Sequence, residues 1–119
     1  MSEYVDGFVI PIPKDGIEKY RLIAEKASKI WLGHGALEYR ECIAEDLTAK
    51  DMVSFADLAK AAATETVVFA WITYQSRAHR DEVNAKVMAD PRIQELTSDD
   101  CPFDCSRMAY GGFETIVKA

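Results

Sequence analysis

His34 is the side chain best suited to proton transfer in this sequence, because it stands between two glycines where a helix is expected to end. The C-terminal end of a helix favours the imidazolium form, so an imidazole there can titrate near neutral pH. A general base of this kind removes a proton from an activated carbon or a hydroxyl group. The alternative is a histidine that caps the helix by bonding backbone carbonyls. His34 is therefore the predicted catalytic residue, with the structural alternative left open.

Aromatic and cationic side chains supply the predicted substrate contacts. Aromatic residues at strand spacing are usually core residues, and only a neighbouring cavity gives them a binding role. Arg77 and Arg80 fall in the first turn of an expected helix, at the positive end of its dipole. This position predicts carboxylate partners such as Asp81, Glu82 or Asp104, or else an anionic ligand. The predicted substrate-binding residues are Tyr39, Trp71, Tyr74, Arg77, Arg107 and Tyr110.

Two other polar residues are expected to have structural roles. His79 recurs with Val83 and Val87 at four-residue steps, which places it on or beside the packing face of its helix. Asp6 lies on an otherwise apolar strand face, so its carboxylate needs a partner or a raised pKa. The predicted partners of Asp6 are Arg40, Arg107 and the backbone at Gly7.

The sequence predicts neither a metal site nor a cofactor. Its three cysteines, Cys42, Cys101 and Cys105, form an odd set, which argues against a disulfide framework. A metal at Cys101 and Cys105 would need more ligands, and the two histidines are distant in sequence. A glycine-rich phosphate loop, a metal-spaced histidine pair and a serine nucleophile elbow are also absent from the sequence.

Size and charge narrow the class of protein. A chain of 119 residues predicts one domain, residues 1–119, because two halves would be too small to bury adequate cores. The net charge of -6 without a Lys/Arg cluster disfavours nucleic-acid binding. No apolar run reaches the ~18 residues needed to span a bilayer. The N-terminus lacks the basic and apolar regions of a secretory signal, so a cytoplasmic location is expected.

Hydrophobic periodicity predicts a strand, a helix, two strands, a second helix and a final strand. The first strand, Tyr4–Ile12, contains Gly7, which predicts a bulge or a close backbone approach. The second strand, 36–45, carries many charges and is expected at a sheet edge. The third, Glu65–Tyr74, is apolar on both faces and is expected at the centre of the sheet. The first helix is expected from Ile17 to Trp31.

In the second half of the chain the predicted helices and strands are separated by longer loops. Ser76 is expected to cap a helix over 77–89, followed by a helical turn over 92–96 and a polar loop over 97–105. The last strand, 107–117, contains Gly111 and Gly112, which predict a bulge. The segment 46–64 fits either a helix or a short extended piece.

This order predicts an α+β, ferredoxin-like βαββαβ fold, with a four-stranded antiparallel sheet and two helices on one face. The first and third strands are expected at the centre. Two helices cover only one face, and both central strands are apolar on both faces, so the other face should be an interface. We therefore expect a homodimer in which two sheets pack face to face as an α+β barrel. A small internal cavity covered by residues 46–64 is the alternative explanation.

Several contiguous runs carry a family resemblance, namely HGALEY (34–39), ETVVFAWI (65–72), SRAHRDEVNAKVMADP (76–91), PFD (102–104) and RMAYGGF (107–113). These runs resemble the YbaA-like family, an uncharacterised bacterial family also called domain of unknown function 1428. The resemblance spans nearly the whole chain and implies the dimeric α+β-barrel superfamily, which includes small monooxygenases, isomerases and YciI-like proteins. It implies no established activity and therefore no catalytic residues.

Two functions remain open at this point. The first is a cofactor-independent small-molecule enzyme, similar to a monooxygenase or an isomerase, with His34 as acid or base in a mostly apolar pocket. The second is a non-catalytic dimeric module that binds a ligand or is associated with stress. In both, the expected partners are a second copy of the chain and a small molecule, with no nucleic acid and no membrane.

Overall fold

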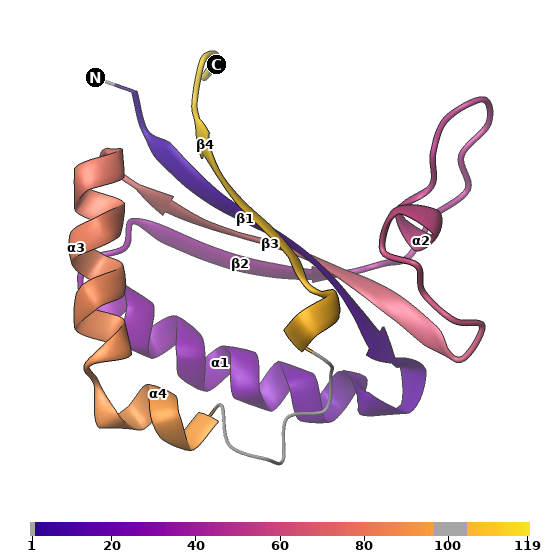
Figure 1. Cartoon of the computed structure of the whole chain (residues 1–119), viewed down its shortest axis with the longest axis horizontal. Coiled ribbons are helices and arrows are strands. Elements are labelled where there is room, and N and C mark those ends of the chain that lie inside the picture. Colours follow the sequence, from indigo (N-terminus) through magenta and orange to yellow (C-terminus); the bar gives the residue numbers. More distant parts are fainter. Residues whose placement is uncertain (1, 97–104) are drawn as a thin grey trace.

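The computed structural model describes residues 2–96 and 105–119, and four of its strands form one antiparallel sheet in the order β2-β3-β1-β4 (Figure 1). β1 and β3 are central and β2 is at an edge, as the sequence predicts. The strand order and the helices between the strands give the α+β, ferredoxin-like architecture. The strands are β1 (Tyr4–Pro13), β2 (Glu38–Ile43), β3 (Glu65–Tyr74) and β4 (Ala109–Glu114). The helices are η1 (Lys14–Gly16), α1 (Ile17–Gly33), α2 (Phe55–Leu58), α3 (Arg77–Met88), α4 (Pro91–Leu96) and η2 (Cys105–Arg107).

The longer helices α1 and α3, with α4, all lie on one side of the sheet (Figure 1). Alternate strand residues point toward these helices and form the core, because side chains along a strand alternate between its faces. The core has one cluster around Tyr74, Val83 and Val87 and another around Ile12 and Tyr20. The positions of the apolar residues along α1 and α3 therefore determine which face of each helix is buried.

Local capping explains where the helices begin and end. The Ser76 hydroxyl accepts a hydrogen bond from the backbone N–H of His79 at 3.1 Å, so Ser76 is the predicted N-cap of α3. At the end of α1, the backbone N–H of His34 donates to the carbonyl of Ile30 at 3.1 Å. Gly35 follows with a φ of 113°, a conformation that favours glycine. None of the helices among residues 2–96 and 105–119 has the length and hydropathy needed to cross a membrane.

The opposite face of the sheet is only partly covered. The short helix α2 reaches it at one end, where the rings of Phe55 and Phe69 lie 5.7 Å apart. The rest is an apolar hollow of about 660 Å³ whose floor includes Gly7, Trp71 and Phe113. Residues of this face remain accessible to solvent, including Phe69 at 43% and Phe113 at 61% exposed. We call this surface the open face.

The two bulges suggested by the glycines are absent from the central pairing of the described strands. Gly7 pairs with Gly111 and Asp6 with Gly112 in an unbroken antiparallel register. The glycines have a different physical role, because the ring of Phe113 lies over Gly7 and Gly111. A Cβ built on Gly7 would stand only 3.3 Å from that ring. The predicted bulge at 111–112 is therefore wrong. At Gly7 the close neighbour is a side chain, rather than the predicted bulge or close backbone approach.

Candidate functional site

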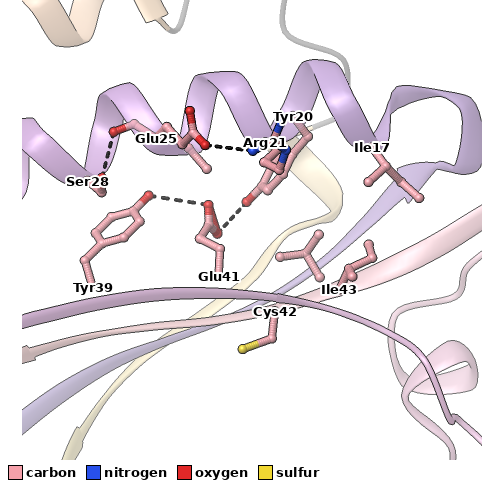
Figure 2. A pocket seen from close by; sticks show the side chains of 11 residues that line it. Ile17, Tyr20, Arg21, Glu25, Ser28, Tyr39, Glu41, Cys42 and Ile43 are labelled. Atoms are coloured by element: carbon pink, nitrogen blue, oxygen red, sulfur yellow. Dashed lines mark hydrogen bonds and ion pairs between the residues drawn. The ribbon is translucent and has the colours of Figure 1, made fainter.

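A carboxylate with two tyrosine hydroxyls lies between α1 and the edge strand β2. The Tyr20 hydroxyl donates a hydrogen bond to Glu41 Oε1 at 2.6 Å. The Tyr39 hydroxyl donates to Glu41 Oε2 at 3.4 Å. Figure 2 shows Tyr39 and Glu41 rising from the sheet toward α1, where Tyr20 meets them. We call these three residues the Glu41 cluster.

The residue pattern of β2 and α1 explains why the side chains of the Glu41 cluster point toward one another. Tyr39, Glu41 and Ile43 alternate along β2, so they share the face that looks toward α1. Tyr20 lies on the buried face of α1, on the same side of the helix as Ala24. The intervening residue Cys42 points away from α1 (Figure 2).

Two pockets meet at the Glu41 cluster, and both are lined by Tyr20, Ala24, Tyr39 and Glu41. The first, the edge pocket, lies between α1 and β2 and has a volume of about 280 Å³. The second, the central pocket, extends between the helices and the middle of the sheet and has a volume of about 210 Å³. Each is smaller than the ~300–1,000 Å³ typical of small-molecule sites, and the two pockets share the Glu41 cluster in their linings.

The lining of the central pocket is mainly apolar. Its walls include four aromatic side chains, and the rings of Trp31 and Tyr39 lie 6.0 Å apart in a tilted arrangement. Aliphatic side chains from β1, β3, α1 and α4, together with Met108 and the charged Arg40, complete the lining around Glu41. The aromatic residues are Phe8, Tyr20, Trp31 and Tyr39. A surface of this composition suits the apolar part of a small molecule.

Burial controls the protonation of the Glu41 cluster. Removal from water raises the pKa of the Glu41 carboxyl, and the hydrogen bonds from Tyr20 and Tyr39 offset this only in part. Burial beside this carboxylate also raises the pKa of the Tyr39 hydroxyl, which therefore remains a donor at neutral pH. Among the described residues, Glu41 forms no ion pair. Glu41 is thus a carboxylate held by neutral donors at the junction of the two pockets.

His34 lies outside this site. Its Nε2 atom lies 2.8 Å from Asp90 Oδ2, which connects the end of α1 to the segment before α4. Asp90 also accepts hydrogen bonds from the Arg92 guanidinium, and the bonds from Arg92 and His34 lower its pKa. His34 is not among the residues that line the edge pocket or the central pocket. Its catalytic role therefore stays a prediction without support from this geometry.

The predicted substrate-binding residues are dispersed over the fold. Tyr39 lines both pockets, whereas Trp71 lies on the open face, where its indole N–H donates to Glu38 at 2.9 Å. Tyr74 is fully buried and donates to the Asn84 side chain at 3.2 Å. Tyr110 accepts a hydrogen bond from Arg80 at 2.8 Å.

The two arginines predicted to bind substrate, Arg77 and Arg107, also lie apart from the edge and central pockets. Arg77 is exposed on α3. Arg107 bonds Glu65 at 2.8 Å and the carbonyl of Lys60 at 2.7 Å, near the opposite end of β3 from Tyr74. Of the six residues predicted to bind substrate, the structure brings only Tyr39 to the candidate site.

The predicted burial of Asp6 is confirmed, but its predicted partner is wrong. Asp6 is 1% exposed and accepts a hydrogen bond from Arg80 Nη1 at 2.7 Å, rather than from Arg40 or Arg107. Arg80 also bonds Asp81 at 2.8 Å, as the charge at the start of α3 predicts. The sequence could not identify the Asp6 partner because α3 and β1 meet only through the tertiary fold. His79 accepts from the backbone N–H of Gln75 at 3.0 Å, which fits the expected structural role.

Glu41 is the site residue that sequence reasoning missed. The signal was present, because Glu41 alternates with Tyr39 and Ile43 on one face of a strand that must be partly buried. A charged residue in such a position requires a partner or a function. The charge of this strand instead suggested only its edge position. Within the described residues, no group of three or more histidine, cysteine, aspartate or glutamate side chains is arranged to hold a metal ion.

Known structures share this fold at low sequence identity. A dimeric ferredoxin-like protein from an uncultured marine organism aligns with a TM-score of 0.65 and 10% identity, over 100% of both chains. A nipsnap family protein of unknown function from Agrobacterium tumefaciens aligns with a TM-score of 0.61 and 14% identity, over 95% of this chain and 87% of that one. A putative antibiotic biosynthesis monooxygenase from Nitrosomonas europaea gives 0.56 and 11%, over 96% and 90%.

Sequence comparison gives a nearer relationship. The uncharacterized protein YbaA of Escherichia coli K12 is 44% identical over 115 residues, which cover 97% of each chain. The YbaA protein of Shigella flexneri matches with the same identity and coverage. The family model described as "Protein of unknown function (DUF1428)" matches residues 3–105. This chain therefore belongs to the DUF1428 family, as its resemblance to YbaA-like sequences predicts.

Proposed function

We propose that the protein binds a small, mainly apolar molecule in the central and edge pockets, with a donor group of that molecule at Glu41. One observation carries this proposal: a half-buried carboxylate, whose hydrogen bonds within the described residues come from two tyrosine hydroxyls, lies where two pockets meet. Binding sites commonly combine an apolar lining with a small number of convergent polar groups. Glu41 and the two tyrosines are the convergent polar groups here, and the mainly apolar walls of the central pocket are the lining.

An enzyme built on this site would use Glu41 as its acid or base and would need no cofactor for proton transfer. The raised pKa of Glu41 supports this role, because a general base works best when its pKa lies near the working pH. The likeness to a putative monooxygenase concerns the fold alone and assigns no reaction. In this proposal Glu41 takes the place of His34, whose imidazole is paired with Asp90.

A thermal-shift screen of small metabolites tests the binding proposal, since a ligand of the folded state raises its apparent stability. Ala24 lines both pockets and is 8% exposed, so Ala24→Met fills them. Ala59 is equally buried and lines neither pocket, which makes Ala59→Met the matched control. We expect ligands that stabilise the wild type and Ala59→Met but not Ala24→Met. Ligands that stabilise all three proteins equally, or a screen without ligands, would contradict the proposal.

Catalysis is tested with the same ligands. Mass spectrometry of each ligand after incubation with the protein would reveal a product. We expect any turnover to disappear in Glu41→Gln and to persist in His34→Asn. Turnover that needs His34 and not Glu41 would instead support the prediction made from the sequence.

We also propose that the chain, a single domain over residues 1–119, forms a homodimer through the open face. The apolar hollow of about 660 Å³ and the exposed rings of Phe69 and Phe113 support this assembly, since large exposed apolar patches usually mark interfaces. The pairing of β1 with β4 joins the two ends of the chain in one sheet and supports the single domain. The marine ferredoxin-like neighbour is described as dimeric.

Sedimentation velocity at micromolar concentration tests the dimer. Phe69→Glu places a charge on the open face and should yield a folded monomer. Leu22→Glu, at a similarly exposed position on α1, should leave the dimer intact. A wild-type monomer under these conditions would overturn the proposal.

A further inference from the structure

The charge around Glu41 restricts the chemistry of the ligand further, and this step rests on the binding site proposed above. The two donors to Glu41 are neutral hydroxyls, at 2.6 Å and 3.4 Å. A carboxylate drawn out of water without a cation is electrostatically unfavourable, and a positive ligand would relieve that penalty. An anionic ligand would meet the repulsion of Glu41 in a weakly screened environment.

The nearby cations are already engaged elsewhere. Arg21 lines the edge pocket, but its guanidinium bonds Glu18 and also Glu25, the latter at 2.8 Å. Arg40 neighbours Glu41 along β2 and contributes to the lining of the central pocket, but its guanidinium lies 3.3 Å from Glu38 and 5.9 Å from the centre of the Trp71 ring. Strand alternation puts both of these partners on the open face. Neither arginine therefore neutralises Glu41.

Aromatic rings complete the surroundings of a cation. Tyr20, Trp31 and Tyr39 line the central pocket beside Glu41, and the faces of such rings attract ammonium groups within about 6 Å. The chain's net charge of -6 also favours the approach of a cation. The apolar remainder of the pocket then suits a hydrocarbon group on the same molecule.

We propose that the ligand is a small organic ammonium ion. Its charged nitrogen would lie against the Glu41 carboxylate, and its hydrocarbon group would occupy the central pocket between α1 and the sheet. Such a ligand would pair its charge with the carboxylate, contact the aromatic rings through its ammonium group and pack its hydrocarbon group against the apolar lining. A neutral alcohol satisfies only the hydrogen-bonding capacity of Glu41, and a carboxylate ligand is repelled by it.

Three probes of nearly the same shape test this selectivity: benzylamine, benzyl alcohol and benzoate. Calorimetry or ligand-observed NMR with the full-length protein at pH 7.5 measures their affinities. We expect benzylamine, a cation at this pH, to bind at least about tenfold more tightly than benzyl alcohol, and benzoate to bind most weakly. In Glu41→Gln the preference for the amine should fall below about threefold.

Glu82→Gln is the matched control, because Glu82 is an exposed acidic residue of α3 that lines neither pocket. It should keep the preference for benzylamine. Lowering the pH should reduce the preference in the wild type as Glu41 takes up a proton. Besides Glu41, the titratable groups that line the two pockets are Tyr20, Arg21 and Glu25 of α1 and Tyr39, Arg40 and Cys42 of β2. Benzylamine itself remains charged.

The possible failures are distinguishable. Equal affinity for the amine and the alcohol, or a preference that persists in Glu41→Gln, would overturn the ammonium proposal and leave the binding site standing. If none of the three probes binds the wild type at millimolar concentration, the ammonium proposal is overturned. A metabolite screen without ligands would then remove the binding site as well.

Discussion

Arg80 of α3 donates a hydrogen bond from Nη1 to Asp6 Oδ1 of β1 at 2.7 Å, joining residues 74 positions apart in the chain. Asp6 is fully buried, and the Arg80 side chain is only 13% exposed. The guanidinium also lies 5.0 Å from the centre of the Tyr4 ring and bonds the Tyr110 hydroxyl. This buried pair fixes the start of α3 over the centre of the sheet.

Loss of Arg80 should leave Asp6 as an unpaired buried carboxylate. We expect Arg80→Ala to lower the free energy of unfolding by about 3 kcal/mol, as measured by urea denaturation. Arg77→Ala, in the same turn but exposed, should change it by less than about 0.5 kcal/mol. Adding Asp6→Asn to Arg80→Ala should recover part of the loss, because the buried charge is removed. Equal effects of the two arginine variants would contradict this account.

The two tyrosines of the Glu41 cluster should contribute unequally. Tyr20→Phe removes the 2.6 Å hydrogen bond to Glu41 and should lower the free energy of unfolding by about 1.5 kcal/mol at pH 7. Tyr39→Phe removes a donor at 3.4 Å and should have an effect of less than about 0.5 kcal/mol. Chemical denaturation of both variants measures the difference. A larger loss in Tyr39→Phe would show that the shorter contact is not the stronger one.

The stability of the protein should depend on the protonation of Glu41. Burial raises its pKa, so the folded state binds the proton more tightly than the unfolded chain does. This contribution is fully present below the ordinary glutamate pKa, about 4.3, and is lost as the pH rises through the folded-state pKa. Glu41→Gln should therefore be more stable than the wild type at pH 7.5, and the two should converge near pH 4. A difference independent of pH would contradict this prediction.

The Glu65–Arg107 pair should have the opposite pH dependence. Hydrogen bonds from Arg107, and a further one from the backbone N–H of Ala62, lower the pKa of Glu65 to about 2, from an ordinary 4.5. The stability that this pair provides is present above the ordinary pKa and is lost as the pH falls from about 4.5 toward 2. Arg107→Gln should therefore flatten the loss of stability in this range, as followed by thermal unfolding. An unchanged acid profile would show that the pair contributes nothing measurable.

Sequence pattern predicts most of the secondary structure of this chain because the physical signals are local. The apolar steps of α1, the Ser76 cap of α3 and the two-sided apolar run of β3 are all readable within a few residues. The charged β2 and apolar β3 also predict their edge and central positions, since burial of a strand's two faces depends on its place in the sheet. Membership of the DUF1428 family likewise follows from contiguous runs of residues.

The site was decided by the tertiary structure. The predicted end of α1 beside His34 is confirmed. The fold, however, places the His34 imidazole against Asp90 rather than in a pocket. Glu41 becomes a candidate site residue only in the folded protein, where the hydroxyl of Tyr20, 21 residues earlier on α1, donates a hydrogen bond to it. Sequence alone determined the order of the four sheet strands and of α1 and α3, together with the strand faces, because these follow from periodicity and capping. It left open the segment 46–64, which holds α2. Which polar side chains become partners depends on how helices pack on the sheet, and only the three-dimensional structure fixes those distances.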